Sequence, residues 1–271
     1  MTDSPAGFMN RPDWKLPPGV PRALWHYTQS DEIADSYDEF FEHTELLAFD
    51  RQVVSDVLSS ELNSKSIVAD LGCGSGRMVA TLAERSSHVL AVDLSHAMLD
   101  TVCQKTTEIA DRVIPLCSNL VTLSGISTGS VDHAICMFAT LGMIQGRSNR
   151  NAATEHIYRI LKPGGKLILH VHNYWYSLRD QKGVRWVLGN ILKGLFRKHA
   201  EVGDRVFTYR GIPNMFHHSF AWRELKRMLR HRGFKINRRI CLNPSRAAEL
   251  KWPWLLPSLR ANGWIVICTK E

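Results

Sequence analysis

Apolar residues along this 271-residue chain follow two alternating spacings, one typical of strands and one typical of helices. Short apolar runs predict seven strands, at residues 67–71, 89–92, 113–117, 131–138, 166–171, 235–241 and 264–269. Spacings of three and four predict helices at residues 78–83, from about residue 95, at 155–161 and at 222–231. This alternation predicts a mainly parallel sheet with helices on both faces.

The segment before the first strand is predicted to form an N-terminal extension, residues 1–62, that packs on a core domain of residues 63–271. Its first thirty residues are rich in proline and are expected to be extended, pinned by Trp14 and Trp25. Two helices should follow, the second over residues 46–58 and the first carrying a single apolar face of Ile33, Tyr37, Phe40 and Phe41.

After the fifth predicted strand the alternation stops, which predicts an insertion or lid at about residues 175–216. Lys162, Pro163 and the two glycines after them should form a structural turn before that strand. Within the insertion, Arg185 and Lys193 separate apolar residues that recur at helical spacing, namely Val184, Val187, Leu188, Ile191, Leu192 and Leu195. This pattern predicts a basic amphipathic helix.

The first predicted strand ends in three alternate glycines, Gly72, Gly74 and Gly76, directly before a helix. Glycines at such a bend allow a ligand to approach the backbone closely at the helix N-terminus. Dinucleotide sites use a different glycine spacing, and the carboxylate of Asp70, two residues before Gly72, would repel a pyrophosphate. The turn therefore favours a cationic nucleoside over a nicotinamide dinucleotide.

Asp93 closes the second predicted strand, 23 residues after Asp70. A carboxylate at this point of a strand–turn–helix unit, roughly twenty residues beyond the glycines, can accept hydrogen bonds from ribose hydroxyls. The glycine turn and this acid together predict a nucleoside site at the carboxyl ends of the strands.

With these features the chain resembles the class I S-adenosylmethionine (SAM)-dependent methyltransferases, particularly the broad group of ubiquinone and menaquinone methyltransferases. The resemblance extends from about Tyr27 to Asn173 and depends on residues 68–76, 89–98, 131–143 and 161–167. It implies an α/β, Rossmann-like, doubly wound fold with a mainly parallel seven-stranded sheet, an N-terminal helical extension and a helical insertion after the fifth strand. It also implies a SAM-dependent methyltransferase, without specifying the methyl acceptor.

The same resemblance implies roles for individual residues. The methionine end of SAM would be surrounded by Asp70, Gly72, Cys73, Gly74 and Gly76, and the ribose would be bound by Asp93. The adenine would be flanked by Leu94 and Met98 and contacted by Asn119 and Leu120, where Asn119 replaces the acid usual in the family. Phe138 and Ala139 would line the methyl side, and Tyr37 would close over the cofactor.

A general base is needed only when the acceptor arrives protonated. His172 is the candidate, because it lies at the carboxyl end of a strand and shares one strand face with His170. The alternative is a structural histidine with local hydrogen bonds. His217 and His218 could contact substrate, but no carboxylate neighbours them in the sequence, and no metal site is expected.

The net charge of +8 is distributed unevenly. Up to Asn173 there are 14 Lys and Arg against 20 Asp and Glu, a net −6, whereas the remainder has 20 against 6, a net +14. The leading hypothesis is methyl transfer to a small organic acceptor. The basic C-terminal third motivates a tRNA methyltransferase of the wobble-uridine type as the alternative.

Two further alternatives are a non-catalytic SAM-binding module and contact with a membrane surface through the basic segment 184–198. The oligomeric state is not predicted. Six scattered cysteines without a C-x-x-C pair argue against zinc and a disulfide framework, and most should be small buried hydrophobes. With no long apolar run or leader pattern in this sequence, a cytoplasmic location is expected.

Overall fold

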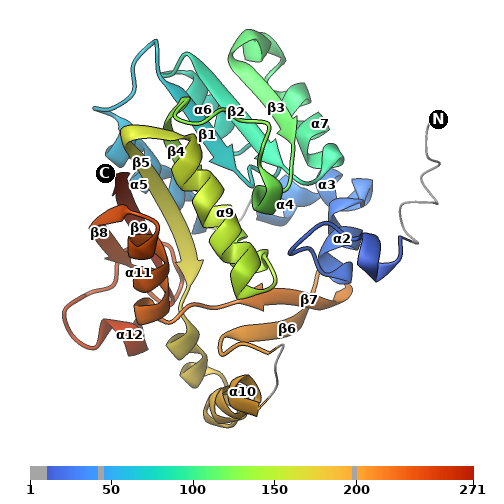
Figure 1. The fold of residues 1–271 in the computed structure, drawn as a ribbon, viewed down its shortest axis with the longest axis vertical. Coiled ribbons are helices and arrows are strands. Elements are labelled where there is room, and N and C mark those ends of the chain that lie inside the picture. Colours follow the sequence, from blue (N-terminus) through green and yellow to red (C-terminus); the bar gives the residue numbers. More distant parts are fainter. Residues whose placement is uncertain (1–10, 42–45, 197–199) are drawn as a thin grey trace.

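The computed structural model describes residues 11–41, 46–196 and 200–271, so the end of the predicted basic segment, Lys198, lies outside the described residues. Its centre is one seven-stranded sheet with the strand order β3-β2-β1-β4-β5-β9-β8 (Figure 1). The first five strands are parallel, and β9 runs antiparallel to both of its neighbours. The strands are β1 (Ile67–Leu71), β2 (His88–Asp93), β3 (Val113–Cys117), β4 (Val131–Cys136), β5 (Leu161–His172), β8 (Phe234–Cys241) and β9 (Gly263–Lys270). The predicted seven-stranded Rossmann-like fold is confirmed.

Helices cover both faces of this sheet (Figure 1). One face packs against α9 (Arg147–Ile160) and α11 (Trp222–His231), and the other against α5 (Leu46–Leu58), α6 (Val79–Ala83) and α7 (His96–Lys105). Neighbouring strand residues divide between the two cores, since Val68 packs with α5 and α6 while Ala69 packs with α9. Shorter elements are η1 (Asp13–Lys15), η2 (Thr107–Arg112), η3 (Leu120–Thr122), α8 (Thr140–Met143), η4 (Tyr174–Arg179) and α12 (Pro257–Arg260).

The N-terminal extension is more ordered than the sequence predicts. Residues expected to be extended form a helix, α2 (Arg22–Thr28), and the single helix expected after it is two short ones, α3 (Asp31–Asp35) and α4 (Tyr37–Phe41). Trp25 is buried, as expected of a pin, but Trp14 is exposed. The expectation that Trp14 anchors this segment is therefore wrong.

Two strand boundaries differ from the prediction. β4 ends at Cys136, because Phe138 and Ala139 adopt left-handed backbone angles (φ of 55° and 63°) that no strand accommodates. β5 begins earlier, at Leu161, and the predicted turn 162–165 bulges from it between the pairs Leu161–Val131 and Lys166–His133.

The insertion contains the predicted helix, α10 (Gly183–Phe196), and an unpredicted hairpin of β6 (Asp204–Tyr209) and β7 (Ile212–His218). Of the six members of its apolar stripe, Val187 is buried and four are exposed, namely Val184, Leu188, Leu192 and Leu195. The hairpin turns at Arg210 and Gly211, which both have positive φ.

Candidate functional site

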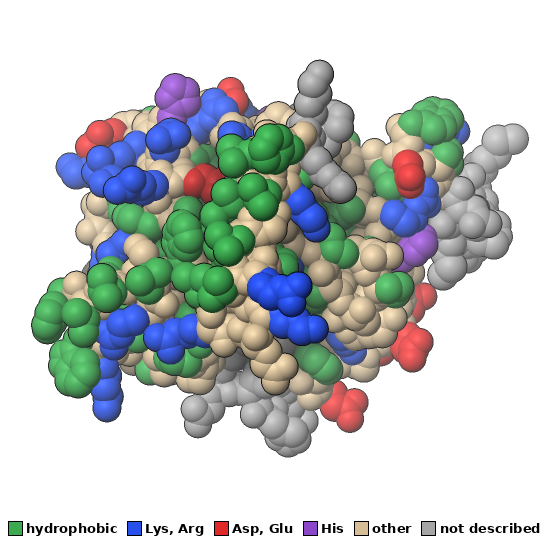
Figure 2. Space-filling model, turned by 90° about the horizontal axis from the view of Figure 1, so that it is seen from below, with side chains coloured by type: hydrophobic (Ala, Val, Ile, Leu, Met, Phe, Trp, Pro, Cys, Tyr) green, Lys and Arg blue, Asp and Glu red, His purple; other side chains and the backbone are tan. Residues whose placement is uncertain are grey.

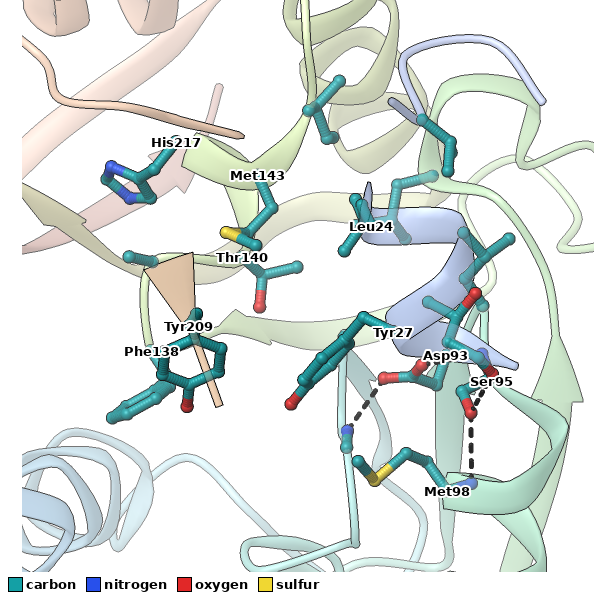
Figure 3. A pocket seen from close by; sticks show the side chains of 18 of the residues that line it. Leu24, Tyr27, Asp93, Ser95, Met98, Phe138, Thr140, Met143, Tyr209 and His217 are labelled. Carbon is teal, nitrogen blue, oxygen red and sulfur yellow. Dashed lines mark hydrogen bonds between the residues drawn. The ribbon is translucent and has the colours of Figure 1, made fainter. Parts of the chain in front are cut away.

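A cavity of about 480 Å³ opens at the carboxyl ends of the parallel strands, where open α/β sheets bind ligands. Its wall is built from the segments that follow β1, β2, β3 and β4, and from the end of β5. The N-terminal helices α2 and α4 and the β6–β7 hairpin close it from the other side. Figure 3 shows Asp93 and Tyr27 at one end of the cavity and His217 at the other.

The glycine turn brings backbone to the cavity wall at Gly72 and Gly74. Gly72 has φ +79°, and its N–H donates to the carbonyl of Val92 at 2.7 Å, which fastens the turn to β2. A Cβ at Gly72 would lie 2.3 Å from Cγ2 of Thr140. Only glycine fits this position, because both the backbone angle and the space exclude a side chain.

We expect Gly72→Ala to lower the free energy of unfolding by about 3 kcal/mol, about 1 from the left-handed backbone and the rest from overpacking against Thr140. The matched control is Gly129→Ala, which has φ +63° but no atom within 4 Å of the added Cβ. That control should lose only about 1 kcal/mol. Urea unfolding of both variants measures the difference, and equal losses would contradict the steric argument.

Asp93 lines the cavity with both carboxylate oxygens anchored. Oδ2 accepts the N–H of Gly74 and Oδ1 accepts the N–H of Ser95, each at 2.9 Å (Figure 3). Burial raises the pKa of Asp93, and the backbone N–H donors oppose that rise. Asp93 is the one carboxylate among the described lining residues, and its free lone pairs suit a pair of hydroxyl donors.

Ten of the residues expected at the cofactor line the cavity. The three that do not are Asp70, Cys73 and Gly76. Asp70 is buried at the end of β1. Burial raises its pKa to about 7, with Arg77 lowering it and Asp93 adding to the rise. Burial also raises the pKa of the Cys73 thiol, which makes this side chain a buried hydrophobe rather than a nucleophile.

Four further expected residues, Leu94, Met98, Asn119 and Leu120, line the cavity together. The Asn119 side chain is already engaged, since Oδ1 accepts the N–H of Val121 at 2.9 Å and Nδ2 donates to the carbonyl of Pro18 at 2.8 Å. It caps η3 and holds the N-terminal segment, so one lone pair of Oδ1 and one N–H of Nδ2 are left for a ligand.

The N-terminal segment is fixed over this side of the cavity by two more hydrogen bonds. The hydroxyl of Ser95 donates to the carbonyl of Thr28 at 2.7 Å, and the N–H of Gln145 donates to the carbonyl of Gly19 at 2.8 Å. Residues of this segment therefore line the cavity, namely Gly19, Val20, Leu24, Tyr27 and Thr28.

Tyr37 reaches the cavity from α4, which is tied to the glycine turn. Ser75 donates to Asp38 at 2.6 Å, and Lys105 pairs with the same carboxylate. The guanidinium of Arg77 lies 5.2 Å from the Tyr37 ring and 5.0 Å from the Phe138 ring, so it holds both aromatic walls. Burial raises the pKa of Tyr37, so its phenol remains protonated and can act as a donor.

His172 lines the cavity at the end of β5, but its Nε2 accepts a hydrogen bond from Arg246 at 2.7 Å. The ring stays neutral, because burial and the neighbouring His217 and Arg246 hold its pKa well below 6.5. His170, on the same strand face as predicted, is buried and bonded to Asp50 at 2.8 Å. Since Arg246 occupies its acceptor nitrogen, His172 is a poor base in this arrangement.

His217 also lines the cavity, with its ring centroid 4.7 Å from that of His172. It is buried, and its Nε2 has no hydrogen-bond partner among the described residues. Burial and then His218 lower its pKa to about 3, so the ring is neutral at ordinary pH. Unlike Nε2 of His172, which Arg246 occupies, Nε2 of His217 has no donor among the described residues, and His217 is therefore the better base candidate of the two.

His218 points away from the cavity. No carboxylate is adjacent to it in the sequence, but the fold brings two carboxylates to its ring. Its two ring nitrogens bond Asp204 at 2.8 Å and Glu224 at 3.1 Å. Burial lowers the pKa of His218, but these two carboxylates outweigh it and raise the pKa overall. The ring thereby joins β7 to β6 and α11.

Sequence reasoning missed several lining residues, namely Tyr27, Thr140, Met143, Phe207, Tyr209 and Arg246. Only the aromatic content of the N-terminus hinted at Tyr27, and no motif marks the others. Within the ranges that the structure describes, no group of three or more His, Cys, Asp or Glu is arranged for a metal ion. No helix among the same residues has the length and apolarity needed to cross a membrane.

Comparison with known proteins agrees with this geometry. Residues 68–165 match the family model described as "Methyltransferase domain". An uncharacterised protein of Methanocaldococcus jannaschii is 26% identical over 168 residues, 62% of this chain and 57% of that protein. The ubiquinone biosynthesis O-methyltransferase of Idiomarina loihiensis is 28% identical over 122 residues, 45% of this chain and 46% of that one. The chain thus spans about half the length of the curated relatives it matches.

Among solved structures, the 1,6-didemethyltoxoflavin-N1-methyltransferase of Burkholderia thailandensis, with bound 1,6-didemethyltoxoflavin and S-adenosylhomocysteine, superposes with a TM-score of 0.60. The two are 17% identical, and the match covers 94% of this chain and 92% of that one. The fold is therefore shared along almost the whole chain. Residues 68–165 therefore match a methyltransferase domain, and the sheet order and the glycine turn are those that the resemblance to the class I SAM-dependent methyltransferases implies.

Proposed function

We propose that this protein transfers the methyl group of SAM to a small organic acceptor bound in the cavity. The observation that carries the proposal is that the two ends of the cavity have different polar groups. Asp93, bonded to the glycine turn, lies at one end, and the unpartnered nitrogen of His217 lies at the other. One end suits the ribose of a nucleoside, and the other suits a protonated acceptor.

The residues present fit SAM. Gly72 and Gly74 leave space where a Cβ would enter the cavity wall, and Asp93 supplies acceptors for the ribose hydroxyls. Leu94, Met98 and Leu120 offer apolar surface for the adenine. Bound SAM would supply a methyl group on a positively charged sulfur, which is already activated for transfer.

The acceptor end favours a small molecule. Among its described lining residues the cavity has one arginine, Arg246, although the C-terminal third is strongly basic. The hairpin residues Phe207 and Tyr209 face the N-terminal helices across the cavity and exclude water from an acceptor. Arg246 donates to His172 and can also donate to an anionic or carbonyl group of the acceptor.

In this proposal His217 accepts at Nε2 the proton that the acceptor oxygen or nitrogen loses as it bonds to the methyl carbon. The electron pair of the broken sulfur–carbon bond stays on the sulfur. His172, held by Arg246, packs against the ring of His217 at a tilt of 42° and positions it. The aromatic walls at Tyr37 and Phe138 keep water away from the reacting atoms.

Two incubations test the proposal. The protein is given methyl-labelled SAM together with a small-metabolite extract in one and together with tRNA in the other. We expect label to enter a small-molecule fraction. Label in tRNA would favour the RNA alternative, and binding of SAM without transfer to any fraction would favour a non-catalytic module.

All six cysteines are free, which suits a reducing compartment, and we place the activity in the cytoplasm as part of this proposal.

Asp70 is proposed to attract the ammonium group of the cofactor, and this should make binding depend on pH. Its carboxyl is half ionised near pH 7 in the free protein. A cationic ligand favours the ionised form, so binding lowers the pKa and releases a proton. Affinity for S-adenosylhomocysteine should therefore rise between pH 5 and 7, by up to about tenfold per unit, and level off above pH 7.

Asp70→Asn is the control, since it keeps the side-chain shape without the charge. Its affinity for S-adenosylhomocysteine at pH 8 should be weaker, and the part of the pH dependence due to Asp70 should vanish. Calorimetry in two buffers of different ionisation enthalpy measures the proton release directly. Identical proton release by the variant and the unaltered protein would reject this role.

A further inference from the structure

The outer side of α10 exposes a continuous apolar stripe. Its members recur at helical spacing and are all exposed, with Phe196 reaching 82%, and they are Val184, Leu188, Leu192, Leu195 and Phe196. The opposite side of the helix is held by Val187 and by Asn190, whose amide bonds Asp204 and Gly203 of the insertion. The stripe is therefore presented to solvent by a helix that is anchored on its other side.

A second apolar group lies in α12 and in the segment directly before it. Five large side chains are exposed there, namely Trp252, Trp254 (76%), Leu255, Leu256 and Leu259. The guanidinium of Arg260 donates to the carbonyls of Lys251, Trp252 and Leu255 at 2.9, 3.0 and 3.0 Å. These bonds hold Trp252 and Leu256 in the left-handed region (φ of 54° and 42°), which bulky residues avoid. The backbone of this segment therefore holds these side chains at the surface of the protein.

Both apolar groups border on η4, which packs against α10 and α12. Together they form what we call the α10 face, the side of the molecule at the α10 end of Figure 1. Figure 2 looks onto this end of the molecule and shows hydrophobic side chains gathered there with Lys and Arg among them. Large apolar side chains that gather in exposed positions on one end of a molecule indicate a site that another apolar phase covers.

The charged residues within the two apolar segments of the α10 face are all basic, and the flanking carboxylates of Asp180 and Glu249 are paired with Arg205 and Arg238. Four cations are exposed within its two segments, namely Lys182, Arg185, Lys193 and Lys251. Neither residues 181–196 nor residues 250–260 include a single Asp or Glu. A protein partner of mixed charge would require no such bias, whereas an anionic lipid surface attracts each of these cations.

We propose that the α10 face docks on the surface of a membrane that contains anionic lipids. The leucines, Phe196 and the two tryptophans would enter the boundary between headgroups and acyl chains, while the cations contact lipid phosphates. Tryptophan suits this boundary because its ring is apolar and its N–H is polar. The proposal concerns peripheral binding, and it does not depend on the proposed methyl transfer.

Flotation of the full chain with vesicles tests it. We expect the protein to float with mixed phosphatidylglycerol–phosphatidylcholine vesicles at low salt, about tenfold more than with pure phosphatidylcholine, and to dissociate as salt is raised. Tryptophan emission should shift to shorter wavelength on binding. The double variant Trp252→Ser with Trp254→Ser should lose most of the bound fraction and of the shift.

Matched variants distinguish vesicle binding through the α10 face from binding through basic or apolar residues elsewhere on the surface. Arg185→Gln with Lys193→Gln should lower binding to the mixed vesicles about tenfold or more, whereas Arg223→Gln with Arg227→Gln, on the exposed side of α11, should change it less than twofold. Ile114→Ser, an exposed apolar residue of β3, should change nothing. The proposal is overturned if the protein ignores anionic vesicles, binds both vesicle types equally, or instead dimerises through this face without binding lipid.

Discussion

Asp93→Ala should weaken the binding of S-adenosylhomocysteine by at least about 100-fold. Hydrogen bonds to a charged acceptor contribute about 1.5–3 kcal/mol each, and two ribose hydroxyls would lose theirs together. The variant also removes the acceptors of the N–H groups of Gly74 and Ser95, so Gly74 loses its bond to β2, whereas the backbone bond from Gly72 to Val92 remains. Isothermal titration calorimetry with S-adenosylhomocysteine measures the effect.

Asp93→Asn is the matched control, because the amide keeps the shape and one acceptor oxygen. It should bind more weakly than the unaltered protein and more tightly than the alanine variant. Urea unfolding of each variant identifies affinity that is lost through unfolding. If folded Asp93→Ala bound the ligand as tightly as the unaltered protein, the nucleoside site would have to lie elsewhere.

The sheet could be predicted from the sequence because each strand carries its own signal. The runs at Ile67–Leu71 and Val113–Cys117 are short, apolar and bounded by turn residues, and both strands have the predicted limits. The residues at the cofactor end of the cavity could be predicted equally well. Gly72, Gly74 and Asp93 lie at strand ends that a parallel sheet must bring to one edge.

The hairpin β6–β7 could not be found in this way. Its turn, Arg210-Gly211, lacks the Asn or Asp that usually precedes glycine in such turns, and β6 alternates only between exposed and half-buried residues. The helix that covers the cavity, α2, begins after proline and is held by bonds from Ser95 and Asn119 to neighbouring carbonyls. Contacts between such distant segments leave no periodic pattern in the sequence.

The acceptor end was only partly predictable for a related reason. His172 could be placed at a strand end, but its hydrogen bond to Arg246 joins residues 74 positions apart. Adjacent histidines on an extended strand must point to opposite sides, yet which of them faces the cavity depends on the pairing of β7 with β6. Asp204 pairs with His218 and bonds it, which leaves His217 for the cavity.

His217→Gln should lower kcat by about 100-fold for an acceptor that must lose a proton, since general base catalysis contributes 10²–10⁴-fold. The affinity for S-adenosylhomocysteine should stay the same, because His217 lies across the cavity from Asp93 (Figure 3). The acceptor identified with labelled SAM is the substrate for this measurement. His172→Gln should have a smaller effect, because Arg246 already occupies the acceptor nitrogen of that ring.

A phenylalanine variant distinguishes a base from a residue that only fills space, and the pH profile of the unaltered protein tests the low pKa of His217. With a pKa near 3 in the folded protein, His217 stays neutral from pH 5 upward, so its protonation should not reduce activity between pH 8 and pH 5. His217→Phe keeps a ring in place without a nitrogen and should be as slow as the glutamine variant. A phenylalanine variant of full activity would show that the ring nitrogen takes no proton, and a larger loss in His172→Gln would return that role to His172.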